Sequence, residues 1–135
     1  MVEEQVVKEI ITDKMIDAGK QLTEALDDNP EITVSASLWL YFPENNTWSL
    51  IIASPQMHKL GPRRVYEIVL SALLTISAKF PFLSLSDIRV VSSDDPLIEL
   101  LRLVAPTGEE VAGFRFKRNT IKGYYIEDSY IYRVN

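Results

Sequence analysis

The sequence predicts an α+β domain whose elements follow the order α-β-β-α-β-α-β-β. Apolar residues at three- to four-residue spacing indicate helices, and two pairs of alternating segments flank short turns, which is typical of β-hairpins. At 135 residues the chain fits one domain, residues 1–135. We expect the two hairpins and one short strand to form a single mixed or antiparallel sheet, with three helices packed mainly on one face.

Residues 4–27 are predicted to form the first helix, because apolar residues recur on one side and charged residues on the other. The apolar positions are Val7, Ile11, Ala18, Leu22 and Leu26. Asn29-Pro30 ends the segment. Gly19 weakens the pattern, since glycine in a helix interior costs about 1 kcal/mol relative to alanine.

Residues 33–42 alternate strictly between two faces and are predicted to form a strand. Residues 43–47 are typical of a turn, and residues 48–54 are predicted to form the second strand of the hairpin. A simple five-residue loop would pair Phe42 with Trp48, Leu40 with Leu50 and Leu38 with Ile52. Trp39 and Tyr41 lie on the other face of the first strand. That face is partly apolar as well, so we expect another element to cover part of it.

Residues 62–78 form the most apolar segment and are predicted to be a helix that begins with a proline, because a first-turn proline loses no intrahelical hydrogen bond. Apolar side chains almost surround this helix, so we expect it to be buried against the first helix or in a dimer interface. A short strand is predicted over residues 87–92. A last helix follows, capped by Ser93 or Asp95 and ended by Pro106.

The stretch from Phe114 to Arg133 holds four of the six tyrosines and is predicted to form the closing hairpin. Lys122-Gly123 is its best two-residue turn, because glycine supplies the positive φ that tight hairpins need. The numbers of opposed residues then sum to 245, which pairs Phe114 with Ile131, Lys117 with Asp128 and Arg118 with Glu127. Neighbouring residues of a strand point to opposite faces, so Glu127 and Asp128 cannot share one metal ion.

Composition excludes several classes of function. The chain has no cysteine and one histidine, His58, which argues against disulfides, thiolate zinc sites and cysteine nucleophiles. No nucleotide-binding, zinc-protease or serine-hydrolase motif occurs, so we predict no catalytic residue, metal or cofactor. A net charge of −5 disfavours non-specific nucleic-acid binding. The charged first residues and the lack of a long apolar run predict a cytoplasmic protein without a membrane segment.

The main candidate site is an aromatic and basic face that forms if the two hairpins join one sheet with matching faces aligned. Its members are Trp39, Tyr41, Arg115, Asn119, Tyr124, Tyr130 and Tyr132. Tyrosine and arginine are enriched at binding hot spots. The alternative is that these aromatic residues form a second core under the first helix. A further candidate is an anion site made by His58, Arg63 and Arg64 at the positive end of the helix over residues 62–78; the alternative for His58 is a solvent-facing loop position.

These features favour a non-enzymatic module that binds a protein partner, a second copy of itself as a homodimer, or a ligand, through the aromatic face or the apolar helix. One alternative is an enzyme or small-molecule sensor with Arg, Lys, Tyr and Asp around a pocket between sheet and helix. Another is weak nucleic-acid binding through the basic segment 115–122.

Three stretches together carry a resemblance: "ASLWLYF", the return strand ending in "IIASP", and "RFKRNTIKGYYIEDSYIYR". Their combination resembles a family of small uncharacterised prokaryotic domains with the same layout, over most of the chain after about residue 30. The resemblance implies a prokaryotic, cytoplasmic source. It implies no activity and no functional residue.

Overall fold

The computed structural model describes residues 9–135, which form an α+β fold. Its elements are α1 (Asp13–Asp27), β1 (Ala36–Phe42), β2 (Thr47–Ala53), α2 (Gln56–Lys59), α3 (Pro62–Ile76), a 3-10 turn (Leu85–Asp87), β3 (Ile88–Val91), α4 (Pro96–Val104), β4 (Phe114–Arg115), β5 (Asn119–Ile121), β6 (Tyr124–Ile126) and β7 (Ser129–Val134). The predicted order of elements is confirmed with two differences: the four-residue helix α2 is an addition, and each strand of the last hairpin is divided in two, into β4 and β5 and into β6 and β7.

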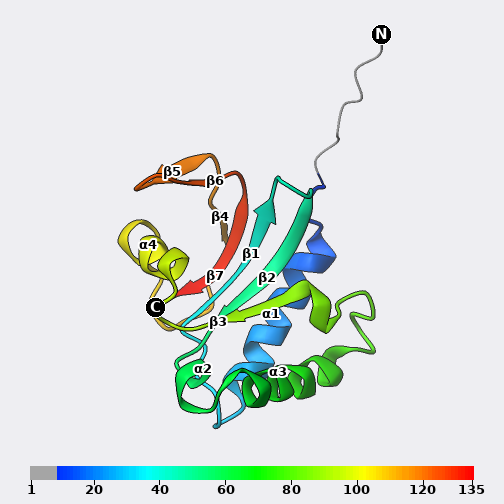
Figure 1. The fold of residues 1–135 in the computed structure, drawn as a ribbon. Coiled ribbons are helices and arrows are strands. Elements are labelled where there is room, and N and C mark those ends of the chain that lie inside the picture. Colours follow the sequence, from blue (N-terminus) through cyan, green and yellow to red (C-terminus); the bar gives the residue numbers. More distant parts are fainter. Residues whose placement is uncertain (1–8) are drawn as a thin grey trace.

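Five strands form a mixed sheet in the order β3-β2-β1-β7-β4, in which only β2 and β3 run parallel (Figure 1). The expectation of one sheet is wrong for the end of the last hairpin, because β5 and β6 form a separate two-stranded sheet. Arg118, just before β5, has a φ of 54°, a left-handed conformation that interrupts the extended strand. We call the β5–β6 pair, residues 119–126, the hairpin tip.

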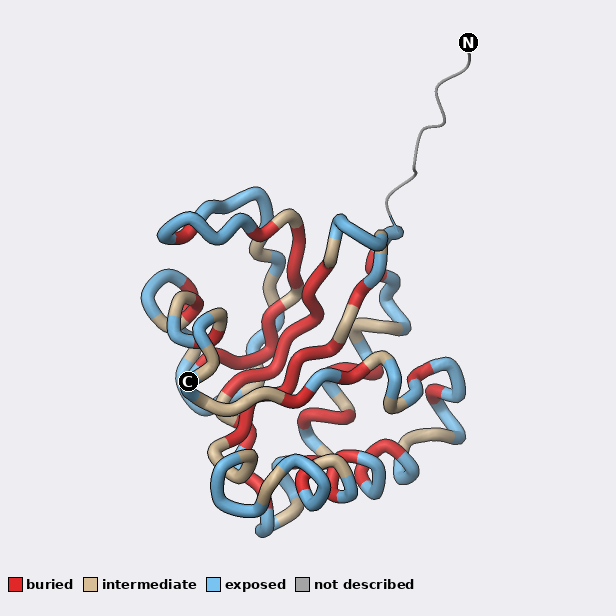
Figure 2. The backbone as a smooth tube through the Cα atoms, viewed as in Figure 1, coloured by how far each residue is buried: buried red, intermediate tan, exposed pale blue. Residues whose placement is uncertain are grey.

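Helices cover both faces of the sheet, which corrects the expectation that they lie mainly on one. Helices α1 and α3 pack on one face and on each other, as predicted for the helices over residues 4–27 and 62–78. Helix α4 and the hairpin tip lie over the opposite face (Figure 1). The cause is that β1 is apolar on both sides: Leu38 belongs to the α4 side and Trp39 to the α1 side, and both are buried. Figure 2 shows the central strands buried and the hairpin tip largely exposed.

Helix α1 begins at Asp13, so the prediction of helix is wrong for residues 9–12, while residues 4–8 lie outside the described part of the chain. Thr12 is the N-cap, and its hydroxyl accepts a hydrogen bond from the backbone N–H of Met15 at 3.2 Å. Before the cap, the carbonyl of Glu9 accepts a hydrogen bond from Trp48 Nε1 at 3.0 Å, which ties this segment to β2.

The register of the first hairpin differs from the prediction by one residue. Tyr41 pairs with Trp48, and Phe42 pairs with Thr47 rather than with Trp48. A one-residue shift is penalised only when one face is polar, and both faces are apolar here. The turn decides instead, because Asn46 has a φ of 50° and shortens the loop to residues 43–46.

The remaining elements follow their predicted signals. Helix α3 has its proline in the first turn, and Pro106 follows α4. Asp95, one of the two predicted caps of α4, accepts a hydrogen bond from Leu97 N at 3.0 Å. In the last hairpin Phe114 pairs with Ile131 and Ile121 with Tyr124, so the predicted register is confirmed. No helix within residues 9–135 is long and apolar enough to cross a membrane.

Candidate functional site

The centre of the predicted aromatic face lies under α1. Trp39 and Tyr132 are 2% and 1% exposed. The indole N–H of Trp39 donates to the carbonyl of Met15 at 2.9 Å, and the hydroxyl of Tyr132 donates to the carbonyl of Ile16. Gly19 allows this approach, because a Cβ there would lie 2.4 Å from the Tyr132 hydroxyl oxygen. These two aromatic residues are core, the alternative that the sequence left open.

Two further members of the predicted face extend this core. Tyr41 is buried against Trp48, with ring centroids 5.4 Å apart, and its hydroxyl donates to Asn46 Oδ1 at 2.7 Å. Tyr130 is half-buried and meets the ring of Tyr132 edge-on at 5.4 Å. Burial raises the pKa of Tyr132 above the range in which tyrosine ordinarily ionises. A continuous exposed aromatic patch therefore does not form, because α1 covers this side of the sheet.

Arg115 is engaged in an ion pair with a buried carboxylate. Its guanidinium binds both oxygens of Asp128, with Nε 3.0 Å from Oδ1, and Asp128 is 1% exposed. The predicted register places Lys117 directly opposite Asp128 and so predicts an ion pair between these two residues. That assignment is wrong, because the arginine side chain reaches the diagonal position and its planar fork matches both carboxylate oxygens.

The other predicted charge pair is also replaced. Arg118 and Glu127 face each other through the backbone, with an N···O distance of 3.2 Å. The carboxylate of Glu127 instead accepts a hydrogen bond from the hydroxyl of Tyr125 at 2.8 Å. Asn119 is exposed on the hairpin tip and donates to the carbonyl of Lys117.

Each of the three basic side chains of the predicted anion site has a carboxylate partner. His58 Nε2 lies 3.1 Å from Asp94, and hydrogen bonds from Ser92 and then His58 lower the pKa of Asp94. Arg64 lies 2.6 Å from Glu31, whose hydrogen bond raises the pKa of Arg64. Arg63 lies 3.6 Å from Glu67 on the same helix. An anion bound at this place would compete with these exposed carboxylates for the same basic groups.

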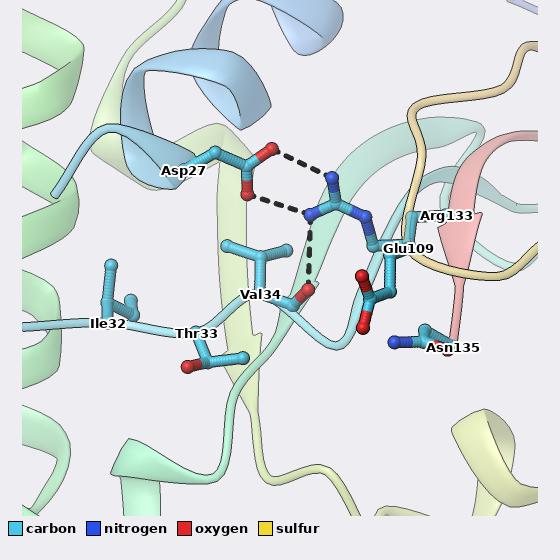
Figure 3. Close-up of a pocket in the computed structure, with 7 residues that line it drawn as sticks. All are labelled: Asp27, Ile32, Thr33, Val34, Glu109, Arg133 and Asn135. Atoms are coloured by element: carbon cyan, nitrogen blue, oxygen red, sulfur yellow. Dashed lines mark hydrogen bonds and ion pairs between the residues drawn. The ribbon is translucent and has the colours of Figure 1, made fainter. Parts of the chain in front are cut away.

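One cavity of about 330 Å³ lies beside a buried arginine, Arg133, that no pattern in the sequence marks as a site residue (Figure 3). Arg133 on β7 is 6% exposed, and its guanidinium donates to both oxygens of Asp27 at 2.8 Å and to the carbonyl of Val34 at 3.2 Å. Glu109 and Asn135 complete the polar wall. The two terminal nitrogens of Arg133 make these three contacts, whereas its buried Nε has no hydrogen-bond partner among the described residues. The ion pair with Asp27 joins the end of α1 to the sheet and compensates the charge of Arg133.

A second cavity, of about 270 Å³, lies on the opposite face of the sheet, between β1–β3, the start of α4 and the hairpin tip. We call it the α4-face pocket. Its apolar walls are Leu40, Ile51, Val91 and Leu97, and its polar rim is Arg89, Asp95 and Tyr124. Strand alternation explains part of this set, because Arg89 and Val91 point to one side of β3 while Ile88 and Val90 enter the core under α3.

The polar rim contains charges that are not paired with one another. Arg89 lies over the ring of Phe42 at 4.9 Å and has no ion-pair partner among the described residues. Asp95 uses one oxygen on the first turn of α4. Tyr124 is 39% exposed. Burial, followed by the charges of Glu44 and Asp95, raises the pKa of Tyr124, and Arg89 opposes that shift.

Tyr124 is the only residue of the predicted aromatic face that takes part in this pocket. The alternation of β3 is enough to predict which side of the strand Arg89 faces, whereas the sequence around Asp95 indicates only a helix cap. What the sequence lacked was the placement of the hairpin tip over α4, which brings Tyr124 to them. Within residues 9–135, no group of three or more histidine, aspartate or glutamate side chains is placed to hold a metal ion.

Comparisons of the chain with models of protein families, with curated proteins and with solved structures found no match.

Proposed function

We propose that this chain is a small ligand-binding module and that the α4-face pocket is its binding site. The observation that supports the proposal is the convergence of Arg89, Asp95 and Tyr124, from three separate elements, over an apolar floor. Ligand sites are typically concave and mostly apolar, with a few polar groups that fix orientation. A perturbed tyrosine pKa at the rim is typical of such sites.

The pocket suits binding because its polar groups remain available. Arg115 and Arg133 spend their guanidinium groups on the acids Asp128 and Asp27. Arg89 instead lies over the ring of Phe42 and has no ion-pair partner within residues 9–135, and the Tyr124 hydroxyl makes no hydrogen bond within those residues. The engagement of Arg115 also weakens the case for nucleic-acid binding through residues 115–122.

A second candidate is self-association through the outer side of α3. This helix buries one side against α1 and leaves Leu70 and Leu74, one turn apart, 40% and 64% exposed. Adjacent exposed leucines favour contact with another protein surface. Solution mass of the full chain tests this candidate: Leu74→Lys should convert a dimer to a monomer, and a monomeric wild-type chain would rule it out.

The proposal is tested by screening the full chain against small metabolites for a rise in melting temperature, since a ligand that binds only the folded state stabilises it. Tyr124→Ala should remove the shift given by a true ligand. Tyr125→Ala is the matched control, because Tyr125 is its neighbour on the hairpin tip and is 53% exposed. A screen without any shift, or a shift kept in Tyr124→Ala, would contradict the proposal.

A further inference from the structure

The α4-face pocket holds one positive and one negative side chain on the same rim. Arg89 enters from the edge strand β3, and Asp95 enters from the N-cap of α4. Within residues 9–135 neither forms an ion pair, so the two groups are not within 4.0 Å of each other. The rim therefore presents two separated, opposite charges to whatever enters.

A ligand with a single charge would satisfy only half of this rim. A carboxylate placed against Arg89 would leave Asp95 as an unpaired acid nearby, and Glu44 adds to the negative potential at Tyr124. An ammonium group placed against Asp95 would leave Arg89 as an unpaired cation. Like charges beside a partly desolvated group cost affinity, whereas complementary charges add both affinity and orientation. A ligand that carries both charges pairs each of them.

The rest of the pocket is apolar and small. Leu40 and Ile51 are 3% and 2% exposed and form the floor, while the half-buried Val91 and Leu97 form the sides. The cavity of about 270 Å³ lies just below the lower end of the usual range for ligand pockets, roughly 300–1,000 Å³. An apolar body of a few carbon atoms fits such a floor.

We infer that the ligand is a small zwitterion with an apolar body, which is the chemistry of an apolar α-amino acid. Its carboxylate pairs with Arg89, its ammonium group with Asp95, and its side chain rests on Leu40 and Ile51. This inference rests on the proposed function, because it names the ligand class of that same pocket. The hydroxyl of Tyr124 supplies a hydrogen bond at the mouth of the pocket.

The test compares compounds that share one apolar body. Full-length protein is titrated calorimetrically with L-leucine, with 3-methylbutylamine, which lacks the carboxylate, and with 4-methylpentanoate, which lacks the ammonium group. Each deleted charge should weaken binding by about tenfold, the effect of losing one charge-assisted hydrogen bond. Similar affinities for leucine and for either analogue would overturn the inference.

Two variants assign each charge to its partner. Arg89→Gln should abolish the preference for leucine over the amine and leave its preference over the acid. Asp95→Asn should do the reverse, and it keeps α4 capped because asparagine caps helices as well as aspartate. Loss of both preferences in one variant, or of neither, would overturn the assignment.

Failure of the inference and failure of the proposed function give different results. Equal binding of all three compounds, or of an uncharged alcohol with the same body, would refute the zwitterion while retaining a Tyr124-dependent ligand site. Absence of binding by these compounds together with a metabolite screen lacking any Tyr124-dependent shift would refute both.

Discussion

Asp27 at the end of α1 and Arg133 on β7 form a two-point ion pair with both N···O distances at 2.8 Å, across 106 residues of sequence. Arg133 also donates to the carbonyl of Val34, in the segment that leads into β1. One guanidinium therefore joins the first helix, the segment before β1 and the last strand. Because Arg133 is almost fully buried, its charge depends on Asp27 for compensation.

Removing Asp27 alone should destabilise the fold strongly. We expect Asp27→Ala to lower the free energy of unfolding by about 2–3 kcal/mol, because it leaves a buried cation without a counterion. The double variant Asp27→Ala with Arg133→Met should lose less than the sum of the single losses. Urea denaturation measures both, and Glu24→Ala, an exposed acid on the same helix, is the control. Equal effects of Asp27→Ala and Glu24→Ala would contradict this role.

Gly19→Ala should destabilise the protein although alanine favours helix by about 1 kcal/mol. The added Cβ would lie 2.4 Å from Tyr132 Oη and 2.7 Å from Trp39 Nε1, so α1 must move away from the sheet. Thermal unfolding should show a clear fall in melting temperature. Lys20→Ala, one residue further along and exposed, should leave it nearly unchanged. An increase in stability for Gly19→Ala would refute the close packing described here.

Tyr132 should make the protein less stable at alkaline pH. Burial raises the pKa of Tyr132 above its ordinary value of 10.0, so the unfolded chain loses this proton at a lower pH than the folded one. Its contribution is fully present below pH 10 and is lost as pH rises above that value. The slope from this group approaches about 1.4 kcal/mol per pH unit. In Tyr132→Phe, denaturation followed from pH 9 to 11 should show a shallower decline than in the wild type, and identical slopes would contradict the prediction.

The turn at Lys122-Gly123 should be sensitive to residue type. Both residues have positive φ, 48° and 83°, which is the type I′ geometry. We expect Gly123→Ala to cost about 1 kcal/mol and Lys122→Asn to stabilise by a few tenths of that, because asparagine tolerates the left-handed region. Chemical denaturation measures the free energy of unfolding of the two variants. A more stable Gly123→Ala together with a less stable Lys122→Asn would contradict the type I′ turn.

The two hairpins show what sequence patterns can and cannot determine. The register of the last hairpin was predictable because a Lys-Gly turn with positive φ has one favoured position, and the observed pairs agree with it. The first hairpin was misplaced by one residue because both its faces are apolar. There the deciding feature is the left-handed Asn46, which the polar cluster at residues 43–47 conceals.

Side-chain partners were less predictable than backbone pairing. Asp128 binds the diagonal Arg115 rather than the opposite Lys117, a choice set by side-chain reach and guanidinium shape. Gly19 looked like a weakness of a helix and is required by Tyr132 across the core. The α4-face pocket depends on where the hairpin tip lies over α4, a long-range arrangement that local periodicity does not encode.

The most direct test of the central claim, that the α4-face pocket binds a small zwitterion, is an amide NMR titration of the full chain with L-leucine. We predict saturable chemical-shift changes that are largest at Arg89, Asp95 and Tyr124 and small at Asp27 and Arg133. Saturable changes centred on the Asp27–Arg133 cavity, or no saturable change anywhere, would contradict the claim.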